Sequence, residues 1–471
     1  MFIEKLPFVI LGGELHNSTA SNIEYFASKI DRLKELNCNT LILPAYWELI
    51  EPSEGVFDFE LVDKIIEICD NNGFKIVLLW FATWKNAYST YVPEWVKSDK
   101  TRFFRARNKD GRVQGTISCF CGEARDADAK AFAELMKHLK ATDKNKTVIM
   151  MQLQNEAGVL GMRRDYCEPA NEQFGANVPG ELLDYLKNNT DFKFNYNGEN
   201  WSSVFHEMAD ECFMSYYTAK YIEEAARRGK AEYDMPMFVN AWLVQFDNQA
   251  PGAYPSGGPT HRVIDIWRAA APSIDIYAPD IYLDDFPGVC AQYAREDNPL
   301  LIPEVRRDNH VTANLLYAIG KYKSIGFAPF GIESMDTAEP SGAALAQAYS
   351  LLSNMMGIII DSYKSDSIAG VHWLDKHSLS QDIGGFRIAF NITGESGGAI
   401  VITESEGKYI IIGQNIRYSI NHDEVEYMHI REGRYENGVW VDGRRLNGDE
   451  MHLVTFGDIP EVQRVYVQRK D

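Results

Sequence analysis

The strongest constraint on the fold is a regular alternation of short apolar runs with amphipathic stretches, which extends from Phe8 to about Ile360. Several of the runs are apolar at nearly every position, as is typical of parallel strands that are covered on both faces. The stretches between them place apolar residues at helical spacing. Eight such strand–helix units in succession predict an α/β fold, a (β/α)8 TIM barrel. The predicted strands are Phe8–Glu14, Thr40–Tyr46, Lys75–Trp80, Val148–Gln154, Met237–Ala241, Asp275–Ile281, Leu300–Glu304 and Gly326–Ile332.

After about residue 375 the pattern changes to short runs with partial alternation. Turn signals separate these runs, among them Gly397-Gly398, Asn437-Gly438 and Asn447-Gly448. Such spacing predicts a small antiparallel β-domain, which we expect to be a sandwich. We therefore divide the chain into a catalytic barrel over residues 1–365 and a C-terminal β-sandwich domain over residues 366–471.

Charge and hydropathy exclude several classes of partner. Asp and Glu number 67 against 47 Lys and Arg, so the formal net charge is -20. A phosphate backbone would be repelled by that field, and we predict no nucleic-acid partner. No apolar run approaches the roughly 18 residues that span a membrane, and Met1–Pro7 is too short and too acidic for a secretory signal. We expect a cytoplasmic protein without a membrane partner; the sequence leaves a homo-oligomer open.

Cysteine and histidine usage argues against a metal centre. The seven cysteines lack disulfide-like spacing, and the one close pair is Cys119-x-Cys121. A zinc site would need two more ligands, such as Cys167 or a histidine, so we favour free thiols. A metal-dependent barrel hydrolase would need histidines at several strand ends, where only His16 lies near. We predict no metal and no cofactor.

Catalytic groups in such a barrel lie at the C-terminal ends of the strands, so these ends are where the chemistry is sought. Glu156 and Glu304 close the fourth and seventh predicted strands. Glycoside hydrolysis needs one carboxyl that protonates the leaving oxygen and one carboxylate that traps or stabilises the sugar cation. A single Glu after a strand is more often a helix N-terminal charge. Two neighbouring residues favour the catalytic interpretation. Asn155 can offer its amide to a sugar hydroxyl, and Tyr282 can donate a hydrogen bond that keeps Glu304 ionised.

Other side chains at the strand ends are candidates for substrate binding. Four tryptophans lie there, and aromatic faces stack on sugar rings, although core packing is the alternative for each. Glu51 and Asp280 are interpreted as supports that hydrogen-bond rather than as catalysts. Long connections over residues 84–125 and 157–205 suggest a closed pocket and an exo-acting enzyme. The substrate-binding candidates are Asn155, Tyr282, Trp47, Glu51, Glu14, His16, Trp80, Trp84, Asn240, Trp242 and Glu333.

Glu333 is also a rival for the nucleophile. It would end the eighth strand, or the seventh if one of the early predicted strands is false. We favour Glu304, because Leu300–Glu304 is the cleaner buried strand.

Two motifs carry a resemblance to known enzymes. The run from Tyr46-Trp47 through Glu51-Pro52 to Phe59 resembles the second-strand motif of family 35 and family 42 glycoside hydrolases. Val148–Gly158, with Asn155-Glu156, resembles their fourth-strand acid/base motif. Nearly the whole chain is similar to a bacterial subgroup of family 35 β-galactosidases that has a distinctive C-terminal β-domain, including the tail segment Gly438–Glu450.

The resemblance implies a general acid/base at Glu156, a nucleophile at Glu304 and a ligand of the sugar 2-hydroxyl at Asn155. It implies a retaining enzyme that releases terminal β-D-galactose by double displacement, with carbohydrate as its partner. The first-strand segment Gly12–His16 departs from the better-known family 35 pattern, and the segment around Cys119 does not resemble the four-cysteine zinc cluster of some family 42 enzymes. Alternatives are a β-glucoside, an α-L-arabinopyranoside or a modified galactoside as substrate, or a non-catalytic carbohydrate-binding barrel.

Overall fold

The computed structural model describes residues 2–3, 6–246, 248–421, 424–452 and 454–470 of the 471-residue chain. Eight parallel strands form a closed barrel, and their order around the barrel is their order along the chain. This confirms the predicted barrel and all eight of its strands. The strands are β3 (Ile10–Glu14), β4 (Thr40–Tyr46), β5 (Lys75–Lys85), β8 (Val148–Asn155), β9 (Met237–Trp242), β10 (Ile276–Ile281), β11 (Leu301–Val305) and β12 (Gly326–Pro329).

The barrel strands are buried nearly throughout, as parallel strands covered on both faces should be. The main correction concerns the eighth strand, which ends at Pro329 and not at Ile332. Gly331 has a φ of +65°, which breaks the strand, and a short 3-10 helix η3 (Ile332–Ser334) follows. Glu333 therefore lies beyond the strand and does not end it.

Helices surround the strands, and each buries an apolar face. On α4, for example, Val62, Ile65, Ile66 and Cys69 recur at helical spacing and are buried. The helices are α1 (Ile23–Ala27), α2 (Ile30–Glu35), α3 (Trp47–Ile50), α4 (Glu60–Asn71), α5 (Glu94–Ser98), α6 (Gly122–Thr142), α7 (Glu168–Gly175), α8 (Gly180–Asn189), α9 (Trp201–Phe205), α10 (Ala209–Glu232), α11 (Ile264–Ala270), α12 (Phe286–Tyr293), α13 (Val311–Tyr322), α14 (Pro340–Asn354) and α15 (Met356–Ser365).

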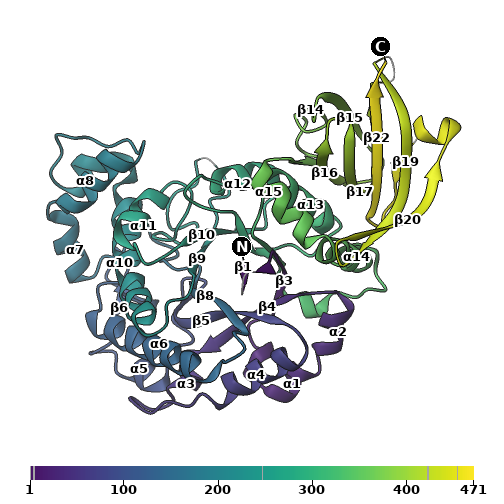
Figure 1. Ribbon diagram of the computed structural model, residues 1–471. Helices are drawn as coiled ribbons and strands as arrows, with labels where there is room; N and C mark the ends of the chain where they lie inside the picture. The colour runs from purple at the N-terminus through teal and green to yellow at the C-terminus, as the bar shows by residue number, and fades with distance from the viewer. Residues whose placement is uncertain (1, 4–5, 247, 422–423, 453, 471) are drawn as a thin grey trace. The chain divides into compact units, whose positions relative to one another are not determined.

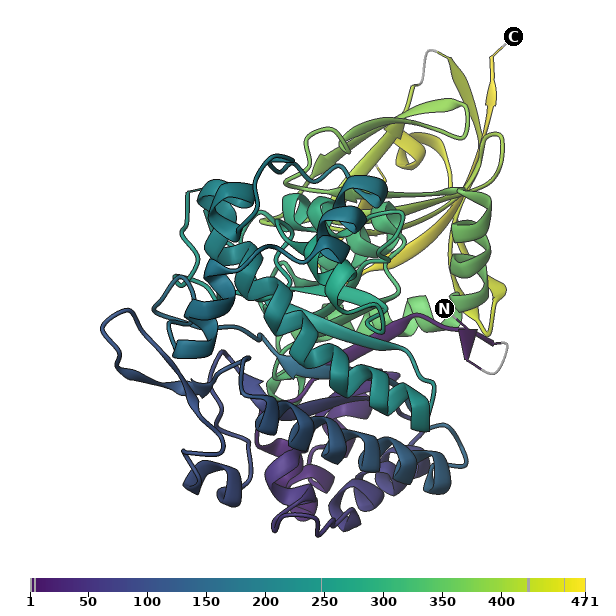
Figure 2. The same cartoon turned by 90° about the vertical axis from the view of Figure 1, so that its left-hand side faces the viewer.

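The chain forms two compact units. The first comprises Met1–His16, Ser28–Thr40 and Ile281–Asp471, and the second comprises Asn17–Ala27 and Leu41–Asp280. Within the second unit, the long helices α6 and α10 lie side by side (Figures 1 and 2). The contact is close because Gly229 of α10 leaves room for the ring of Phe132; a Cβ at Gly229 would come within 2.4 Å of that ring.

The two long connections predicted after the third and fourth strands contain regular structure. The first holds α5 and a hairpin of β6 (Arg105–Arg107) and β7 (Val113–Ile117). The second holds α7, α8 and α9. Aromatic residues pack this helical insertion, with Trp201 5.3 Å from Phe213 between ring centroids. Both segments are therefore folded parts of the second unit rather than plain loops.

The C-terminal strands belong to the first unit and form two antiparallel sheets, ordered β13-β16-β17-β22-β19-β20 and β14-β15-β18-β21. Side chains of both sheets enter one hydrophobic core, including Val401, Ile411, Phe390 and Phe456. The predicted antiparallel β-structure is confirmed, while the sandwich arrangement and the boundary at residue 365 stay predictions. The strands are β13 (Ile368–His372), β14 (Ser380–Ile383), β15 (Phe386–Ile392), β16 (Gly398–Ser405), β17 (Lys408–Gln414), β18 (Ile416–Ile420), β19 (Val425–Glu436), β20 (Val439–Leu446), β21 (Thr455–Phe456) and β22 (Glu461–Arg469).

Helix α13 joins the barrel part of the first unit to these sheets, because it packs against β13 and β16 (Figure 1). The imidazole of His372 on β13 is buried and lies 2.9 Å from Oδ1 of Asn314 on α13. Burial lowers the pKa of His372 to about 3. The Tyr317 hydroxyl donates to Asp375 at 2.7 Å. This contact is thus built on buried polar groups as well as apolar ones.

Among the described residues, no single helix has the length and hydropathy to cross a membrane. The pair α14 and α15 passes by length and composition only when taken together, and it is bent by 71°. All seven cysteines are free thiols.

Candidate functional site

In the first unit, Glu304 lies on β11, the seventh barrel strand. Its side chain is buried, with 4% of the residue exposed. The Tyr282 hydroxyl, just beyond β10, donates a hydrogen bond to Oε2 of Glu304 at 2.7 Å. The hydrogen bond that the sequence led us to expect is therefore present, and it fixes the orientation of the carboxylate.

A cavity of about 500 Å³ lies beside Tyr282. Its wall includes Arg306 and Arg307, which directly follow β11, together with Phe330 and Asp336. Arg307 donates to the carbonyl of Gly331 at 2.9 Å, and Arg306 pairs with Asp284 at 2.7 Å. The space is thus bounded by residues next to Glu304 in sequence and by the segment that follows β12.

Glu333, the other candidate for the nucleophile, lies in the same unit and has hydrogen-bond partners different from those of Glu304. Its Oε1 accepts a hydrogen bond from the backbone N–H of His16 at 2.9 Å and lies 3.1 Å from Nδ1 of that residue. The His16 ring also meets Phe330 edge-on at 5.3 Å. The strand count holds, so Glu333 lies past the eighth strand, and its carboxylate contacts the segment after β3. Glu14 ends β3 and is fully buried.

In the second unit, Glu156 directly follows β8, the fourth barrel strand, and 7% of the residue is exposed. Gln154 and Glu156 both have positive φ, +59° and +47°. Residues other than glycine rarely adopt this left-handed conformation, and such strain is concentrated at functional sites. The backbone N–H of Glu156 donates to Oδ1 of Asn240 at 2.9 Å, and Nδ2 of Asn240 donates to Asp280 at 2.8 Å.

Asn155 is oriented by a lysine that we did not predict. Nζ of Lys85, the last residue of β5, donates to Oδ1 of Asn155 at 2.7 Å, and both residues are buried. A lysine ammonium donates and never accepts, so the amide oxygen must face Lys85 and the NH2 group occupies the other branch of the side chain. The amide is therefore presented as a donor.

A second unpredicted residue, Asp128 of α6, ties together the ends of β5 and β8. Its carboxylate accepts hydrogen bonds from Trp80 at 2.8 Å, from Thr83 at 2.6 Å and from Gln154 at 2.8 Å. Burial raises the pKa of Asp128 despite these three donors. The sequence does hold a signal, since Asp128 precedes Phe132 and Leu135 on the buried face of the helix.

The tryptophans at the strand ends are mostly packed. Trp80 and Trp47 are fully buried and Trp84 is 1% exposed, whereas Trp242 is partly exposed. Trp84 meets the ring of Tyr221 edge-on at 4.7 Å. These contacts favour core packing, the alternative interpretation, for Trp47, Trp80 and Trp84.

Glu51, which we interpreted as a hydrogen-bonding support, accepts two hydrogen bonds. Its Oε2 accepts from Nε1 of Trp47 at 2.8 Å, and its Oε1 accepts from the backbone N–H of Gly55 at 2.7 Å. Both oxygens are thus engaged in holding the loop after α3.

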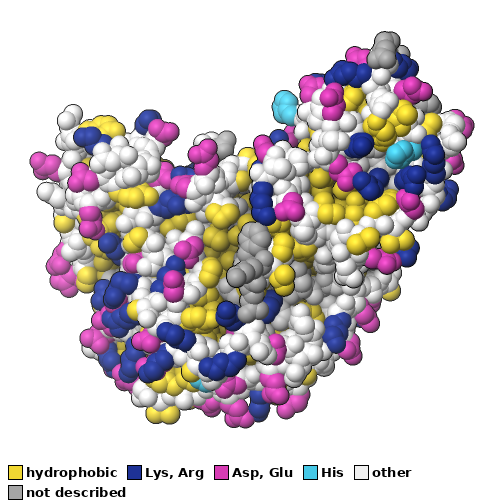
Figure 3. Space-filling model, in the orientation of Figure 1, with side chains coloured by type: hydrophobic (Ala, Val, Ile, Leu, Met, Phe, Trp, Pro, Cys, Tyr) yellow, Lys and Arg dark blue, Asp and Glu magenta, His cyan; other side chains and the backbone are white. Residues whose placement is uncertain are grey.

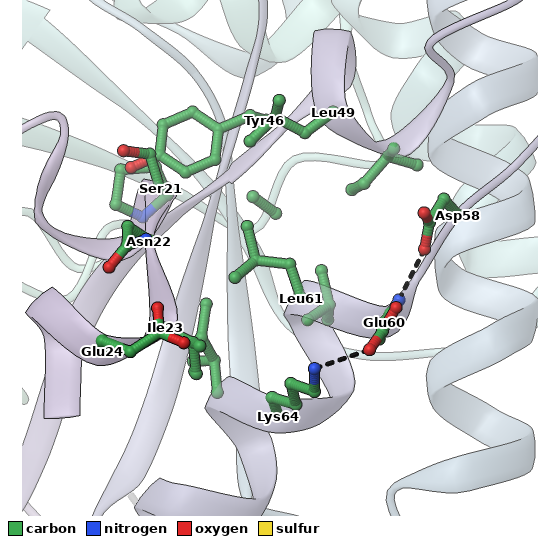
Figure 4. A pocket seen from close by; sticks show the side chains of 15 residues that line it. Ser21, Asn22, Ile23, Glu24, Tyr46, Leu49, Asp58, Glu60, Leu61 and Lys64 are labelled. Carbon is green, nitrogen blue, oxygen red and sulfur yellow. Dashed lines mark hydrogen bonds and ion pairs between the residues drawn. The ribbon is translucent and has the colours of Figure 1, made fainter.

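Another cavity, of about 360 Å³, lies between α1, the end of β4 and the start of α4, and its wall includes Asn22, Tyr46 and Lys64 (Figure 4). The interactions drawn there lie at the start of α4, where Asp58 accepts from the N–H of Glu60 and Glu60 pairs with Lys64. None of the predicted site residues lines it. Within the described ranges, no group of three or more His, Cys, Asp or Glu residues could hold a metal ion.

Two family models match the chain. A model described as β-galactosidase matches residues 18–217, and a model described as a domain of unknown function (DUF5597) matches residues 345–456. The first match includes Asn155 and Glu156 and ends before Glu304. It supports the family 42 part of the expected resemblance and not family 35 specifically. The chain is also 25% identical over 173 residues to β-galactosidase LacZ of Lactobacillus acidophilus, which is 36% of this chain and 24% of that protein.

Solved structures share the fold at low identity. A β-galactosidase from Bacillus circulans sp. alkalophilus has a TM-score of 0.54 and 14% identity, covering 77% of this chain and 58% of that one. A catalytic mutant of Gan42B, a β-galactosidase from G. stearothermophilus, has a TM-score of 0.53 and 14% identity, covering 74% and 57%. The catalytic domain of a β-amylase from Paenibacillus polymyxa has a TM-score of 0.52 and 12% identity, covering 70% and 95%. The chain thus spans less than two thirds of these β-galactosidases, and the likeness concerns the fold alone.

Proposed function

We propose that the chain is a glycoside hydrolase that releases terminal β-D-galactose with retention of configuration, using Glu304 as nucleophile and Glu156 as general acid/base. The observation that carries the proposal is the buried carboxylate of Glu304 on the seventh barrel strand, held by the Tyr282 hydroxyl at 2.7 Å. Glu156 at the end of the fourth strand, in a strained backbone next to an oriented amide, supports it from the second unit.

The reaction takes two steps. In the first, the Glu304 carboxylate attacks the anomeric carbon, the glycosidic C–O bond breaks, and the proton of Glu156 passes to the departing oxygen. In the second, Glu156 takes a proton from water, the hydroxide oxygen attacks the anomeric carbon, and the bond to Glu304 breaks. Two inversions leave the product with the configuration of the substrate. Double displacement requires carboxyl groups about 5–5.5 Å apart.

Neighbouring residues have supporting roles in this proposal. The Asn155 amide donates to the 2-hydroxyl of the sugar, and Lys85 fixes the direction of that amide. Asn240 and Asp280 hold the main chain of Glu156, and Tyr282 holds the Glu304 carboxylate. Trp242, which is partly exposed at the end of β9, is the tryptophan best suited to stack on a sugar ring.

The choice of galactose rests on the matched family model and on the named relatives. β-Glucosides, α-L-arabinopyranosides and modified galactosides are the alternatives, and the exo mode of action, a cytoplasmic location and self-association stay predictions.

The test is hydrolysis of a panel of aryl α- and β-glycosides by the wild type, Glu304→Gln and Glu333→Gln. We expect β-galactoside hydrolysis whose first product, followed by NMR, is the β-anomer. Loss of the nucleophile should lower kcat by about 10⁴-fold or more. Glu333→Gln should keep measurable turnover, since Glu333 lies beyond the eighth strand and hydrogen-bonds His16. A first product of α-configuration, or full activity in Glu304→Gln, would overturn the assignment. Inactivity of a folded wild type on every sugar would favour a binding protein.

A further inference from the structure

The outer face of the six-stranded C-terminal sheet is only partly covered. Ile400 and Ile402 of β16 alternate with the core residues Ala399 and Val401 and are also buried, on the side where α13 packs. Farther across the sheet, on the same side, β22, β19 and β20 surround a cavity of about 340 Å³. Figure 3 shows a histidine and several Lys or Arg side chains gathered over these strands beside hydrophobic ones. The open half of this face is therefore hollowed and chemically mixed.

Aromatic rings and fixed ion pairs line this cavity. Trp440 and Tyr466 provide the rings. Asp442 accepts from both Nε1 of Trp440 and the Arg431 guanidinium at 2.6 Å, which locks the indole and the guanidinium together. Arg464 pairs with Glu404 at 2.6 Å and lies over the Trp440 ring at 5.9 Å.

The cations of this cavity outnumber its carboxylates. Arg431 and Arg464 lie directly opposite each other on β19 and β22. Each is paired with a carboxylate, Asp442 or Glu404, which offsets the repulsion between like charges in that position. Lys408 adds a third cation, 5.0 Å from the centre of the Tyr466 ring, and among the described residues it forms no ion pair. Burial and the nearby Arg431, Arg445 and Arg464 lower the pKa of His429 in the same cavity. A local positive charge thus persists in a chain whose net charge is -20.

We propose that this face binds an acidic carbohydrate, a sugar that carries a carboxylate or a sulfate group. The ring stacks on Trp440 or Tyr466, and the acidic group meets Lys408. The fixed Arg431–Asp442 and Arg464–Glu404 pairs offer both donors and acceptors to hydroxyl groups. This role lies outside the proposed hydrolysis, since neither Glu156 nor Glu304 takes part.

The test is calorimetric titration of the full-length chain with polygalacturonate, a sulfated galactan, a neutral galactan and inorganic polyphosphate. We expect one of the acidic polysaccharides to bind at least about tenfold more tightly than the neutral one. Which of the two binds identifies the acidic group as carboxylate or sulfate. Equal binding of neutral galactan would overturn the acidic specificity. Equal binding of polyphosphate would show that the face binds negative charge without recognising a sugar, which would also overturn the proposal.

Variants assign the binding to this cavity. Tyr466→Ala and Trp440→Ala should each weaken binding about tenfold, and Lys408→Gln about fivefold. Arg434→Gln is the matched control, because it removes a cation from β19 that does not line the cavity. Lys408 is exposed, so its variant should fold even if an aromatic variant does not. Unchanged binding by Lys408→Gln, or an equal loss in Arg434→Gln, would overturn the proposal. Binding is measured apart from hydrolysis, so an inactive enzyme leaves this result intact.

Discussion

Glu156 directly follows the buried strand β8 and Glu304 lies on the buried strand β11, and the hydrogen bonds described above hold different parts of the two residues. At Glu156 the main chain is anchored: its N–H is held by Asn240 and its φ is +47°. At Glu304 the carboxylate itself is anchored, by the Tyr282 hydroxyl. In each case the partner comes from the neighbouring strand, β9 for Glu156 and the end of β10 for Glu304, so the fold supplies both kinds of support.

The difference matches the two roles that we propose. A nucleophile must keep one oxygen aimed at one carbon, and a hydrogen bond to its other oxygen achieves this. An acid/base must give and take a proton in successive steps, and anchoring its main chain keeps the residue in place through both steps. Substitutions at the two positions should therefore produce different kinetic signatures.

After loss of the nucleophile itself, the largest effect should come from Glu156→Ala. On galactosides with poor leaving groups we expect kcat/KM to fall about 10²–10⁴-fold, because no acid protonates the departing oxygen. On an activated aryl galactoside the first step should survive, and added azide should restore turnover, since azide attacks the galactosyl intermediate without needing a base. Rates with and without azide check this. The control is Glu168→Ala, an exposed glutamate in the segment after β8. An equal loss on both kinds of leaving group would contradict the acid/base role.

A smaller effect is expected from Tyr282→Phe, which removes the anchor of the Glu304 carboxylate. A hydrogen bond to a charged group contributes about 1.5–3 kcal/mol, so kcat should fall roughly 10–100-fold while KM changes little. Steady-state kinetics on the activated substrate measure this directly. Tyr322→Phe is the matched control in the same unit, because its hydroxyl interacts with Pro287 and Tyr317. An unchanged kcat would show that Glu304 is held without Tyr282.

The barrel and its strand-end glutamates were predictable from sequence because buried parallel strands are continuous apolar runs, and Glu156 and Glu304 stand out where those runs stop. The supports were harder to foresee. Lys85 and Asp128 reach Asn155 and Gln154 from positions 70 and 26 residues away. No local pattern encodes such pairs. The role of the strand-end tryptophans could not be predicted for a related reason. The sequence places each of them at a strand end, but it does not tell whether the side chain points into the site or into the core.

Lys85→Met tests one of these supports, the hydrogen bond that holds Asn155. Methionine keeps the length of the side chain and removes the donor to Asn155, so the amide loses its fixed direction. We expect kcat/KM for a galactoside to fall about five- to tenfold, as for one lost hydrogen bond. For the corresponding 2-deoxygalactoside we expect almost no change, because the hydroxyl that Asn155 would bind is missing. Lys75→Met, at the other end of β5, is the control. Equal losses of kcat/KM on both substrates would show that Lys85 does not act through the 2-hydroxyl of the sugar.

The smallest effect on activity at neutral pH is expected from His372→Gln. This variant tests whether His372 makes the fold less stable at acidic pH, where the activities of the Glu156 and Glu304 variants would also be compared. The pKa of His372 is about 3 in the folded protein, against about 6.5 in an unfolded chain. Below pH 6.5 the unfolded state therefore binds a proton that the folded state excludes. The free energy of unfolding should fall by about 1.4 kcal/mol per pH unit from this residue, until the pH nears the folded value.

Removing the imidazole should flatten that slope. We expect His372→Gln to melt at a lower temperature than the wild type at pH 7, because the contact to Asn314 is disturbed, and to lose less stability between pH 7 and pH 5. Melting curves by circular dichroism measure both quantities. His377→Gln, an exposed histidine on the same connection, should follow the wild type throughout. If all three proteins lose stability in parallel, His372 is not what limits the fold in acid.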